Sequence, residues 1–187
     1  MLILNFSVKQ LVEVSIFVAL AVVLDFVAKI YSGWFWPYGG SVSFSLVPIA
    51  IIAYRQGWKI GFVSGFLLGI IQLVLGAYIL HPLQVLFDYP LPFAVLGLTG
   101  LWANQVNFNK GRKQRHYIWL STLVASLFRL ACHVISGYAF FASYAPQGMN
   151  PVLYSVMYNF PYVMMSWIAS AIVLVMMYRR HHEIITN

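Results

Sequence analysis

A few ionisable side chains interrupt long apolar stretches of the sequence. Asp88 lies near the start of one such stretch, beside Tyr89, and Arg129 and His133 lie inside another. Arg129, His133 and Gly137 follow one another at intervals of four residues, so they share one face of a helix. An ionisable group in an apolar environment costs several kcal/mol and is by default a candidate for a functional role. We therefore take these residues as candidates for a ligand-binding site.

A third apolar stretch adds aromatic and amide groups. Tyr154 and Tyr158 share a helix face, and Asn159 lies beside it. A carboxylate, an imidazole, an amide and several rings suit a flat heteroaromatic ligand with a positive charge, because each aromatic face stabilises a cation by about 0.5–2 kcal/mol. Asp88 would supply the counter-charge. A simpler interpretation is also open, in which the acid only neutralises Arg129 and the histidine is a hydrogen-bonded core residue.

Composition and hydropathy predict the elements that position these residues. Of the 187 residues, 61% are hydrophobic and 8% are charged, whereas about 25% are charged in an ordinary soluble domain. The chain is therefore predicted to be an all-α integral membrane bundle, with residues 1–187 forming one membrane domain. Charged residues, Pro and Gly divide the apolar sequence into six transmembrane helices, which span about 9–31, 44–54, 60–77, 83–103, 118–140 and 151–178. The second is short, so it either starts within the preceding loop or does not cross the full hydrocarbon layer.

Nine of the eleven Lys and Arg residues fall on one side of this arrangement. The three loops on the opposite side (about 32–43, 78–82 and 141–150) contain no Lys or Arg and are rich in aromatic residues. Since cytoplasmic loops carry an excess of Lys and Arg, the N- and C-termini are both expected to be cytoplasmic. The net charge of +7 does not indicate binding to nucleic acid, because the basic residues are too few and too scattered to follow a phosphate backbone.

Patterns typical of enzymes are missing from the sequence. It has no Gly-rich phosphate loop, no nucleophile elbow, no metal-binding arrangement of His and Cys, and a single cysteine, Cys132. We therefore expect no enzyme activity, no cofactor and no metal. Six helices in 187 residues also leave no room for the doubled bundle of most secondary transporters. A small binding subunit that takes its energy from partner proteins fits better.

Small residues mark two helices as packing surfaces. The third helix carries a glycine every four residues, at Gly57, Gly61, Gly65 and Gly69. Such a strip lets another helix approach closely, so we interpret it as a packing device. The first helix carries a shorter pair of the same kind, Ser15 and Ala19.

Over nearly its whole length, the sequence resembles the thiamine-specific substrate-binding subunit (S-component) of energy-coupling factor (ECF) transporters. The order and spacing of several short stretches carry the resemblance. They are Tyr31-Ser-Gly-Trp34, Val47-Pro-Ile with Arg55-Gln-Gly57, Gly76-Ala-Tyr-Ile-Leu-His-Pro-Leu-Gln-Val-Leu-Phe-Asp88-Tyr89, His133-x-x-x-Gly137 and Tyr154-Ser-x-x-x-Asn159. The resemblance implies a protein of the bacterial cytoplasmic membrane that binds thiamine with high affinity near the outer surface, under a lid formed by the first outer loop. Its implied partners are a transmembrane coupling protein and two ABC-type ATPases.

The resemblance also implies which residues contact ligand and partner. The positions that match the family's ligand contacts are Trp34, Tyr78, Asp88, Tyr89, His133, Gly137, Phe141, Tyr154 and Asn159, and those that match its contacts with the coupling protein are Ser15 and Ala19. Two positions depart from the family. Asp88 replaces the usual Glu and withdraws the carboxylate by one methylene, and Phe141 replaces a Trp and offers a weaker face to a cation.

Two alternatives to a thiamine-binding subunit stay open at this point. One is an S-component for a related pyrimidine precursor or for another vitamin, and the two departures make the pyrimidine precursor more credible. The other is a structural membrane subunit without transport activity, in which the polar residues only hold the bundle together.

Overall fold

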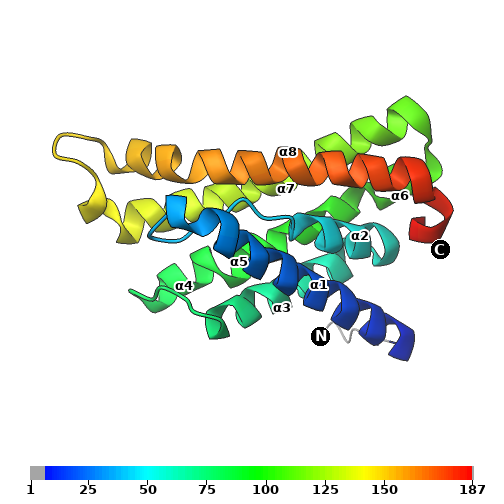
Figure 1. Cartoon of the computed structure of the whole chain (residues 1–187), viewed down its shortest axis with the longest axis horizontal. Helices are drawn as coiled ribbons and strands as arrows, with labels where there is room; N and C mark the ends of the chain where they lie inside the picture. The colour runs from blue at the N-terminus through cyan, green and yellow to red at the C-terminus, as the bar shows by residue number, and fades with distance from the viewer. Residues whose placement is uncertain (1–6, 187) are drawn as a thin grey trace.

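The computed structural model describes residues 7–186, and it describes the side chains of residues 7–180. Within this part of the chain the protein is all-helical, without a strand (Figure 1). In chain order the helices are α1 (Val8–Ser32), α2 (Leu46–Gln56), α3 (Trp58–Val74), α4 (Pro82–Asp88), α5 (Pro90–Ala94), α6 (Ala103–Phe108), α7 (Gly111–Phe140) and α8 (Pro151–Thr186). Three 3₁₀ segments connect them: η1 (Gly33–Phe35), η2 (Val95–Trp102) and η3 (Ala142–Tyr144).

Local sequence signals explain where the helices begin. Ser7 caps α1 in a capping box with Gln10, so that each side chain accepts a hydrogen bond from the other's backbone N–H. His81 caps α4 by accepting from the backbone of Leu83, and Pro82 follows at the first helical position, where its missing N–H costs nothing. Gly57, with φ of 86°, makes the sharp turn between α2 and α3.

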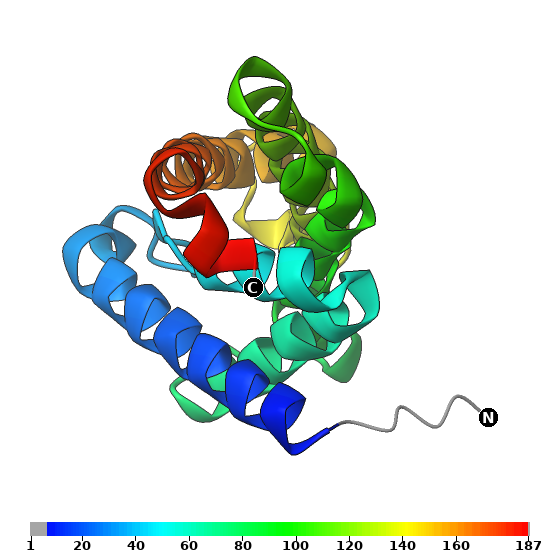
Figure 2. The ribbon, with the colours of Figure 1, turned by 90° about the vertical axis from the view of Figure 1, so that its right-hand side faces the viewer.

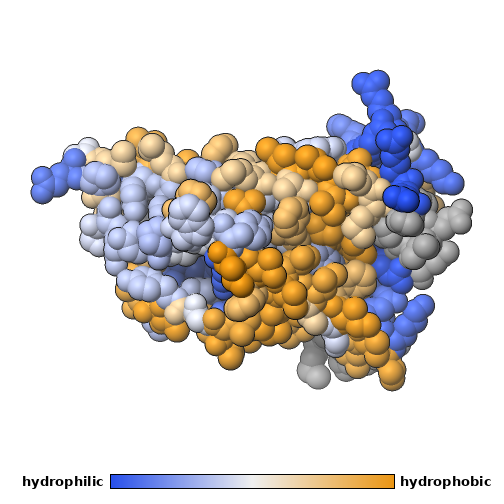
Figure 3. Space-filling model, viewed as in Figure 1, coloured by the Kyte–Doolittle hydropathy of each residue, from blue (hydrophilic) through white to orange (hydrophobic). Residues whose placement is uncertain are grey.

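Four segments of the described chain are long and apolar enough to cross a membrane: Val8–Phe35, Pro82–Phe108, Gly111–Phe140 and Pro151–Arg180. α2 and α3 are apolar but shorter. Apolar side chains cover much of the middle of the molecule and hydrophilic ones gather toward its ends (Figure 3), as expected for a bundle surrounded by lipid.

The shortness of α2 has a structural reason. All nine residues from Leu46 to Tyr54 are buried, and the helix packs against α1, α3, η2 and α8. Figure 2, a view along the bundle, shows α1 lying diagonally on the outside of the other helices. Because α2 is covered by protein rather than by lipid, its length is not set by the thickness of the hydrocarbon layer.

The segment predicted as one helix over 83–103 is interrupted in the structure. α4 ends at Asp88, Tyr89 separates it from α5, and most of the remainder is the 3₁₀ segment η2. Pro90 and Pro92 cause the interruption, since neither can donate a backbone hydrogen bond and each disfavours a helical conformation in the residue before it. The break places Asp88 and Tyr89 at a helix end.

The glycine strip of α3 packs against this interrupted segment. An added Cβ at Gly65 would lie 2.1 Å from the carbonyl oxygen of Phe93, and one at Gly69 would lie 2.5 Å from the carbonyl oxygen of Tyr89. An added Cβ at Gly61 would lie 2.4 Å from the Cβ of Ala53 in α2 and 2.9 Å from the carbonyl oxygen of Gly97 in the interrupted segment. The prediction that these glycines serve close packing is thus confirmed at three of the four positions, while Gly57 lies in the turn.

Candidate ligand-binding site

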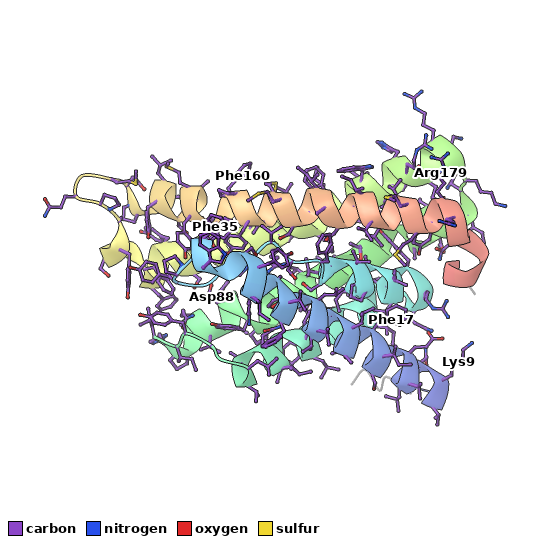
Figure 4. All side chains as sticks on the ribbon, in the orientation of Figure 1. Lys9, Phe17, Phe35, Asp88, Phe160 and Arg179 are labelled. Atoms are coloured by element: carbon purple, nitrogen blue, oxygen red, sulfur yellow. The ribbon has the colours of Figure 1, made fainter. Side chains whose placement is uncertain are left out.

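A cavity of about 400 Å³ opens between the helices at one end of the bundle. Residues of α1, α3, α4, α7 and α8 line it, together with the loop that follows η1. Figure 4 places Asp88 toward this end, and the labelled cations Lys9 and Arg179 toward the other. The volume of the cavity falls in the range of about 300–1,000 Å³ that is typical of small-molecule sites.

Eight of the nine ligand contacts expected from the sequence line this cavity. They are Tyr78, Asp88, Tyr89, His133, Gly137, Phe141, Tyr154 and Asn159. They come from the loop before α4, from α4 and its end, and from α7 and α8. The structure therefore brings residues that are far apart in the sequence, from Tyr78 to Asn159, together in a single cavity.

Trp34 is the exception, because the structure places it outside the cavity. Its side chain is 70% exposed, stacks on Phe35 and donates from its indole nitrogen to the carbonyl of Tyr31. Trp36 lines the cavity instead, packs edge-on against Tyr162, and donates to the backbone of α8. The 3₁₀ turn η1 causes this difference, since it directs Trp34 outward at the end of α1.

Four polar side chains form a chain of hydrogen bonds through the cavity wall. Gln84 donates from Nε2 to Oδ2 of Asp88 over 2.6 Å, and Nδ1 of His133 lies 3.4 Å from Oδ1 of Asp88. Arg129 donates from Nε to Nε2 of His133 over 3.4 Å. Because Arg129 can only donate, Nε2 of His133 must accept, and the proton of the neutral ring must then lie on Nδ1. His133 therefore donates to Asp88.

Arg129 does not contact Asp88 through any hydrogen bond or ion pair within the described residues. His133 lies between them, and the guanidinium lies 4.8 Å above the ring of Phe93. The simpler interpretation, in which Asp88 only neutralises Arg129, therefore has no direct ion pair to support it, because the imidazole of His133 separates the two groups. As a result, the direct partners of Asp88 are two neutral groups, and its negative charge has no direct counter-ion in the described residues.

Asn159, one of the ligand contacts expected on α8, is already hydrogen-bonded to other protein groups. Asn159 donates from Nδ2 to the carbonyl of Ser155 over 2.8 Å and accepts from the hydroxyl of Tyr162 over 2.5 Å. Gly137 faces Ser155 so closely that an added Cβ would lie 2.0 Å from the serine Oγ. These bonds fix the side of the cavity where α7 and α8 meet.

Tyrosines connect the three loops at the mouth of the cavity. Tyr78 and Tyr144 share a hydrogen bond of 2.9 Å between their hydroxyls, and this bond raises the pKa of Tyr144. Tyr38 packs edge-on against Tyr144 with ring centroids 4.6 Å apart, and its backbone N–H donates to Tyr158. Aromatic groups therefore surround the opening on the side formed by the 32–43 and 141–150 loops.

Sequence reasoning missed three polar residues on the wall formed by α1 and α3. Asp25 and Gln72 are buried at this wall, and Lys29 bridges them. The signal was available, since Asp25 and Lys29 interrupt an otherwise apolar helix at a spacing of four residues. Their importance depends on Gln72 of α3, which sequence spacing alone does not connect to α1.

The arrangement is suited to binding rather than to chemical conversion. In the part of the chain that the structure describes, no group of three or more His, Cys, Asp and Glu side chains could hold a metal ion. The cavity instead combines one carboxylate without a direct counter-ion, amide and imidazole groups with fixed orientations, and aromatic rings.

Comparison with known proteins shows which family the chain belongs to. The profile of the thiamine transporter protein family (Thia_YuaJ) matches residues 11–186. The chain belongs to the thiamine transporter family. It is 38% identical over 174 residues to the thiamine transporter ThiT of Bacillus subtilis, with 90% of each chain covered. It is 31% identical to ThiT of Lacticaseibacillus paracasei over 167 residues, which are 81% of this chain and 79% of that protein.

A solved structure of a thiamine transporter has the same fold. ThiT from Listeria monocytogenes matches with a TM-score of 0.84 at 26% identity, covering 95% of this chain and 97% of that one. The resemblance found in the sequence is thereby confirmed, and the family is one of transport proteins rather than enzymes. The binding role of each lining residue stays a prediction.

Proposed function

We propose that this protein binds thiamine in the cavity and is the substrate-specific subunit of its uptake. The observation that carries the proposal is Asp88, a carboxylate in the cavity wall whose direct partners, Gln84 and His133, are both neutral. Such a group attracts a cation, because a partly buried charge is screened less than one in bulk water. The thiazolium ring of thiamine carries a permanent positive charge and has the size and flatness that the aromatic walls accept.

The rings of the cavity complement this charge. Tyr78 and Phe141 lie with centroids 6.1 Å apart, and Tyr154 and Tyr158 with centroids 6.2 Å apart, which gives the ligand aromatic faces from the outer loops and from α8. Each face contributes about 0.5–2 kcal/mol toward a cation. Trp36 adds a further ring on the inner side of the first loop. Binding involves no covalent chemistry.

The same proposal orients the protein in the cytoplasmic membrane of a bacterium. Nine cations lie in segments around Lys9, Arg55, Lys110 and Arg179, and the aromatic loops around the cavity carry none. By the positive-inside rule, both termini are cytoplasmic and the cavity opens to the outside. The chain crosses the membrane with six helical segments, of which α2 is enclosed by the others.

Transport requires partners, and we propose the ECF coupling protein and two ABC-type ATPases. Ser15 and Ala19 support a docking face on α1, since both are exposed there beside Ile16 and Leu20. The Ser15 hydroxyl donates to the carbonyl of Leu11, so it does not need a polar partner on the docking protein. Small residues at this spacing allow another helix to approach closely.

Titration of the purified protein with thiamine, followed by quenching of tryptophan fluorescence, tests the proposal. Replacing Asp88→Asn should weaken binding at least tenfold, because the charge is lost and the amide presents a donor toward Gln84 or His133. Asp88→Glu is the matched control, since it keeps the charge and should retain most of the affinity. No response of the wild-type protein to micromolar thiamine, or equal affinity of the Asn variant, would contradict the proposal.

A thermal-shift screen separates thiamine from the alternatives. Thiamine should raise the melting temperature more than its pyrimidine precursor, riboflavin or biotin, since a ligand that binds only the folded state stabilises it. Stabilisation by another vitamin would reassign the substrate. A protein that no small molecule stabilises would favour a structural subunit.

A further inference from the structure

A second cavity lies where α7 begins beside the end of α8. Its volume is about 250 Å³, and three cationic side chains line it: Lys110 and Arg115 at the start of α7, and Arg179 of α8. Figure 4 shows Arg179 at the end of the bundle away from Asp88, so this cavity is separate from the thiamine cavity. We call it the cationic pocket.

The acidic residues of the chain are too few to neutralise the cationic pocket. Of the four, Glu13 pairs with Arg55 and two line the thiamine cavity. The fourth is Glu183, whose side chain lies outside the described part of the chain. The segments 110–115 and 179–186 contain six Lys and Arg residues against this one acid. Like charges held together in this way repel one another, so the pocket attracts an anion.

The direction of α7 adds to this attraction. The N-terminus of a helix carries a partial positive charge, which cations nearby oppose and an anion stabilises. Lys110 is the N-cap residue of α7 and has no acceptor in its side chain, and the first turn contains no acid. Gly111 has no side chain, so it lines the pocket with its backbone. The buried Gln114 donates to the carbonyl of Val106 over 2.8 Å and thereby fixes the start of α7 against α6.

The cationic pocket lies at the level expected for lipid headgroups. The apolar span of α7 starts at Gly111 and that of α8 ends at Arg180, so the pocket is at the boundary of both spans. On α8, Ile172 and Met176 precede Arg179 at helical spacing and are both exposed. An acyl chain could lie along this exposed apolar ridge while its headgroup lies in the pocket. Basic pockets between transmembrane helices bind anionic headgroups in this way.

We propose that the cationic pocket binds the phosphate of an anionic phospholipid. Arg115 and Arg179 donate to the phosphate oxygens from two different helices, because a guanidinium fork matches the geometry of a phosphate. Lys110 adds charge, and the backbone at the start of α7 faces the same anion. The lipid joins the start of α7 to the end of α8. Its binding does not depend on thiamine.

Two variants with the same change in net charge separate this pocket from a general attraction of basic residues to anionic membranes. Arg115→Gln with Arg179→Gln removes two cations of the pocket. Arg112→Gln with Arg180→Gln is the matched control, since it removes two exposed cations from the same segments that do not line the pocket.

Lipid binding would be measured by native mass spectrometry of the full-length protein in a neutral detergent. The probes are palmitoyl-oleoyl phosphatidylglycerol, the phosphatidylcholine with the same chains, and glycerol 1-phosphate as a soluble source of the same phosphate chemistry. Phosphatidylcholine keeps the phosphate but adds a cation to the headgroup. A size-exclusion profile and the thiamine titration show whether each variant is folded.

The wild-type protein should retain one phosphatidylglycerol and bind it about tenfold more tightly than phosphatidylcholine. The pocket variant should lose about tenfold more affinity for phosphatidylglycerol than the control variant, because it loses direct hydrogen bonds in addition to general attraction. Both variants should bind thiamine as the wild type does. Glycerol 1-phosphate at the lipid concentration should not displace the lipid, since it lacks the acyl chains.

Equal loss of phosphatidylglycerol in the two variants, or equal binding of the two lipids by the wild-type protein, would overturn the proposal. Displacement by glycerol 1-phosphate would replace the lipid by a soluble anion as the ligand. If the pocket variant does not fold, the single replacements Arg115→Gln and Arg179→Gln, compared with Arg112→Gln and Arg180→Gln, decide the outcome. A wild-type protein that binds the lipid but not thiamine would refute the proposed function and leave the cationic pocket intact.

Discussion

The contact between Gly137 of α7 and Ser155 of α8 gives a prediction that can be worked out atom by atom. A Cβ added at Gly137 would lie 2.0 Å from Oγ of Ser155, 2.8 Å from its Cβ and 3.7 Å from its Cα. The first two distances are well inside van der Waals contact, while the third is an ordinary contact. Gly137→Ala must therefore push the two helices apart or displace the serine.

We expect Gly137→Ala to lower the free energy of unfolding by about 1–3 kcal/mol, the usual cost of overpacking. It should also weaken thiamine binding, because His133 and Asn159 are carried by the two helices that separate. Thermal unfolding in detergent and the fluorescence titration measure the two effects.

Second-site replacements at Ser155 separate overpacking from other causes. Ser155→Ala removes the closest atom but leaves the Cβ at 2.8 Å, so it should relieve only part of the cost. Ser155→Gly leaves nothing closer than the Cα and should relieve nearly all of it, once its own effect in the wild-type background is subtracted in a double-mutant cycle. Wild-type stability in Gly137→Ala, or equal rescue by Ala and Gly at position 155, would refute the steric argument.

Three further predictions concern other parts of the molecule. Trp36→Ala should weaken thiamine binding more than Trp34→Ala, because only Trp36 lines the cavity; the reverse order in the titration would assign the contact to the exposed tryptophan. Gly65→Ala should abolish accumulation of folded protein, since its Cβ would lie 2.1 Å from a backbone oxygen that cannot move aside; a normal size-exclusion profile would contradict this. Glu13→Gln should lower the free energy of unfolding by about 1–3 kcal/mol, because Arg55 loses a half-buried carboxylate at 3.0 Å. An unchanged melting temperature would count against that estimate.

Much of the fold follows from the sequence, because an apolar stretch long enough to cross a membrane is restricted to helical structure. The helices other than those over 83–103 overlap the apolar stretches that the sequence indicated, and Gly61, Gly65 and Gly69 pack as their spacing suggested. The interruption at Pro90 was missed, although proline at that position signals it, because hydropathy continues across the break. Hydropathy measures burial or lipid contact and does not distinguish an α-helix from a 3₁₀ segment.

Some residues of the cavity could likewise be identified from the sequence, and others could not. Asp88 and His133 could be identified because ionisable groups in apolar helices stand out, and their depth along α4 and α7 is set by helix geometry. The choice between Trp34 and Trp36 could not be made, since both lie in a turn whose backbone conformation decides which ring points inward. Gln72 was missed because its importance depends on the packing of α3 against α1.

The glycine strip of α3 also bears on how the protein could release its ligand. Where backbone packs on backbone, as at Gly65 and Gly69, no side chain can change rotamer to let the surfaces slide. We therefore expect α3 and the segment from Tyr89 to Gly100 to move as one rigid body. Motion that opens the cavity would then be left to parts that contact this body through side chains, chiefly α1 and the loop that follows it. In a substrate-binding protein built this way, α1 and the loop that follows it can move while α3 and the segment from Tyr89 to Gly100 keep their shape.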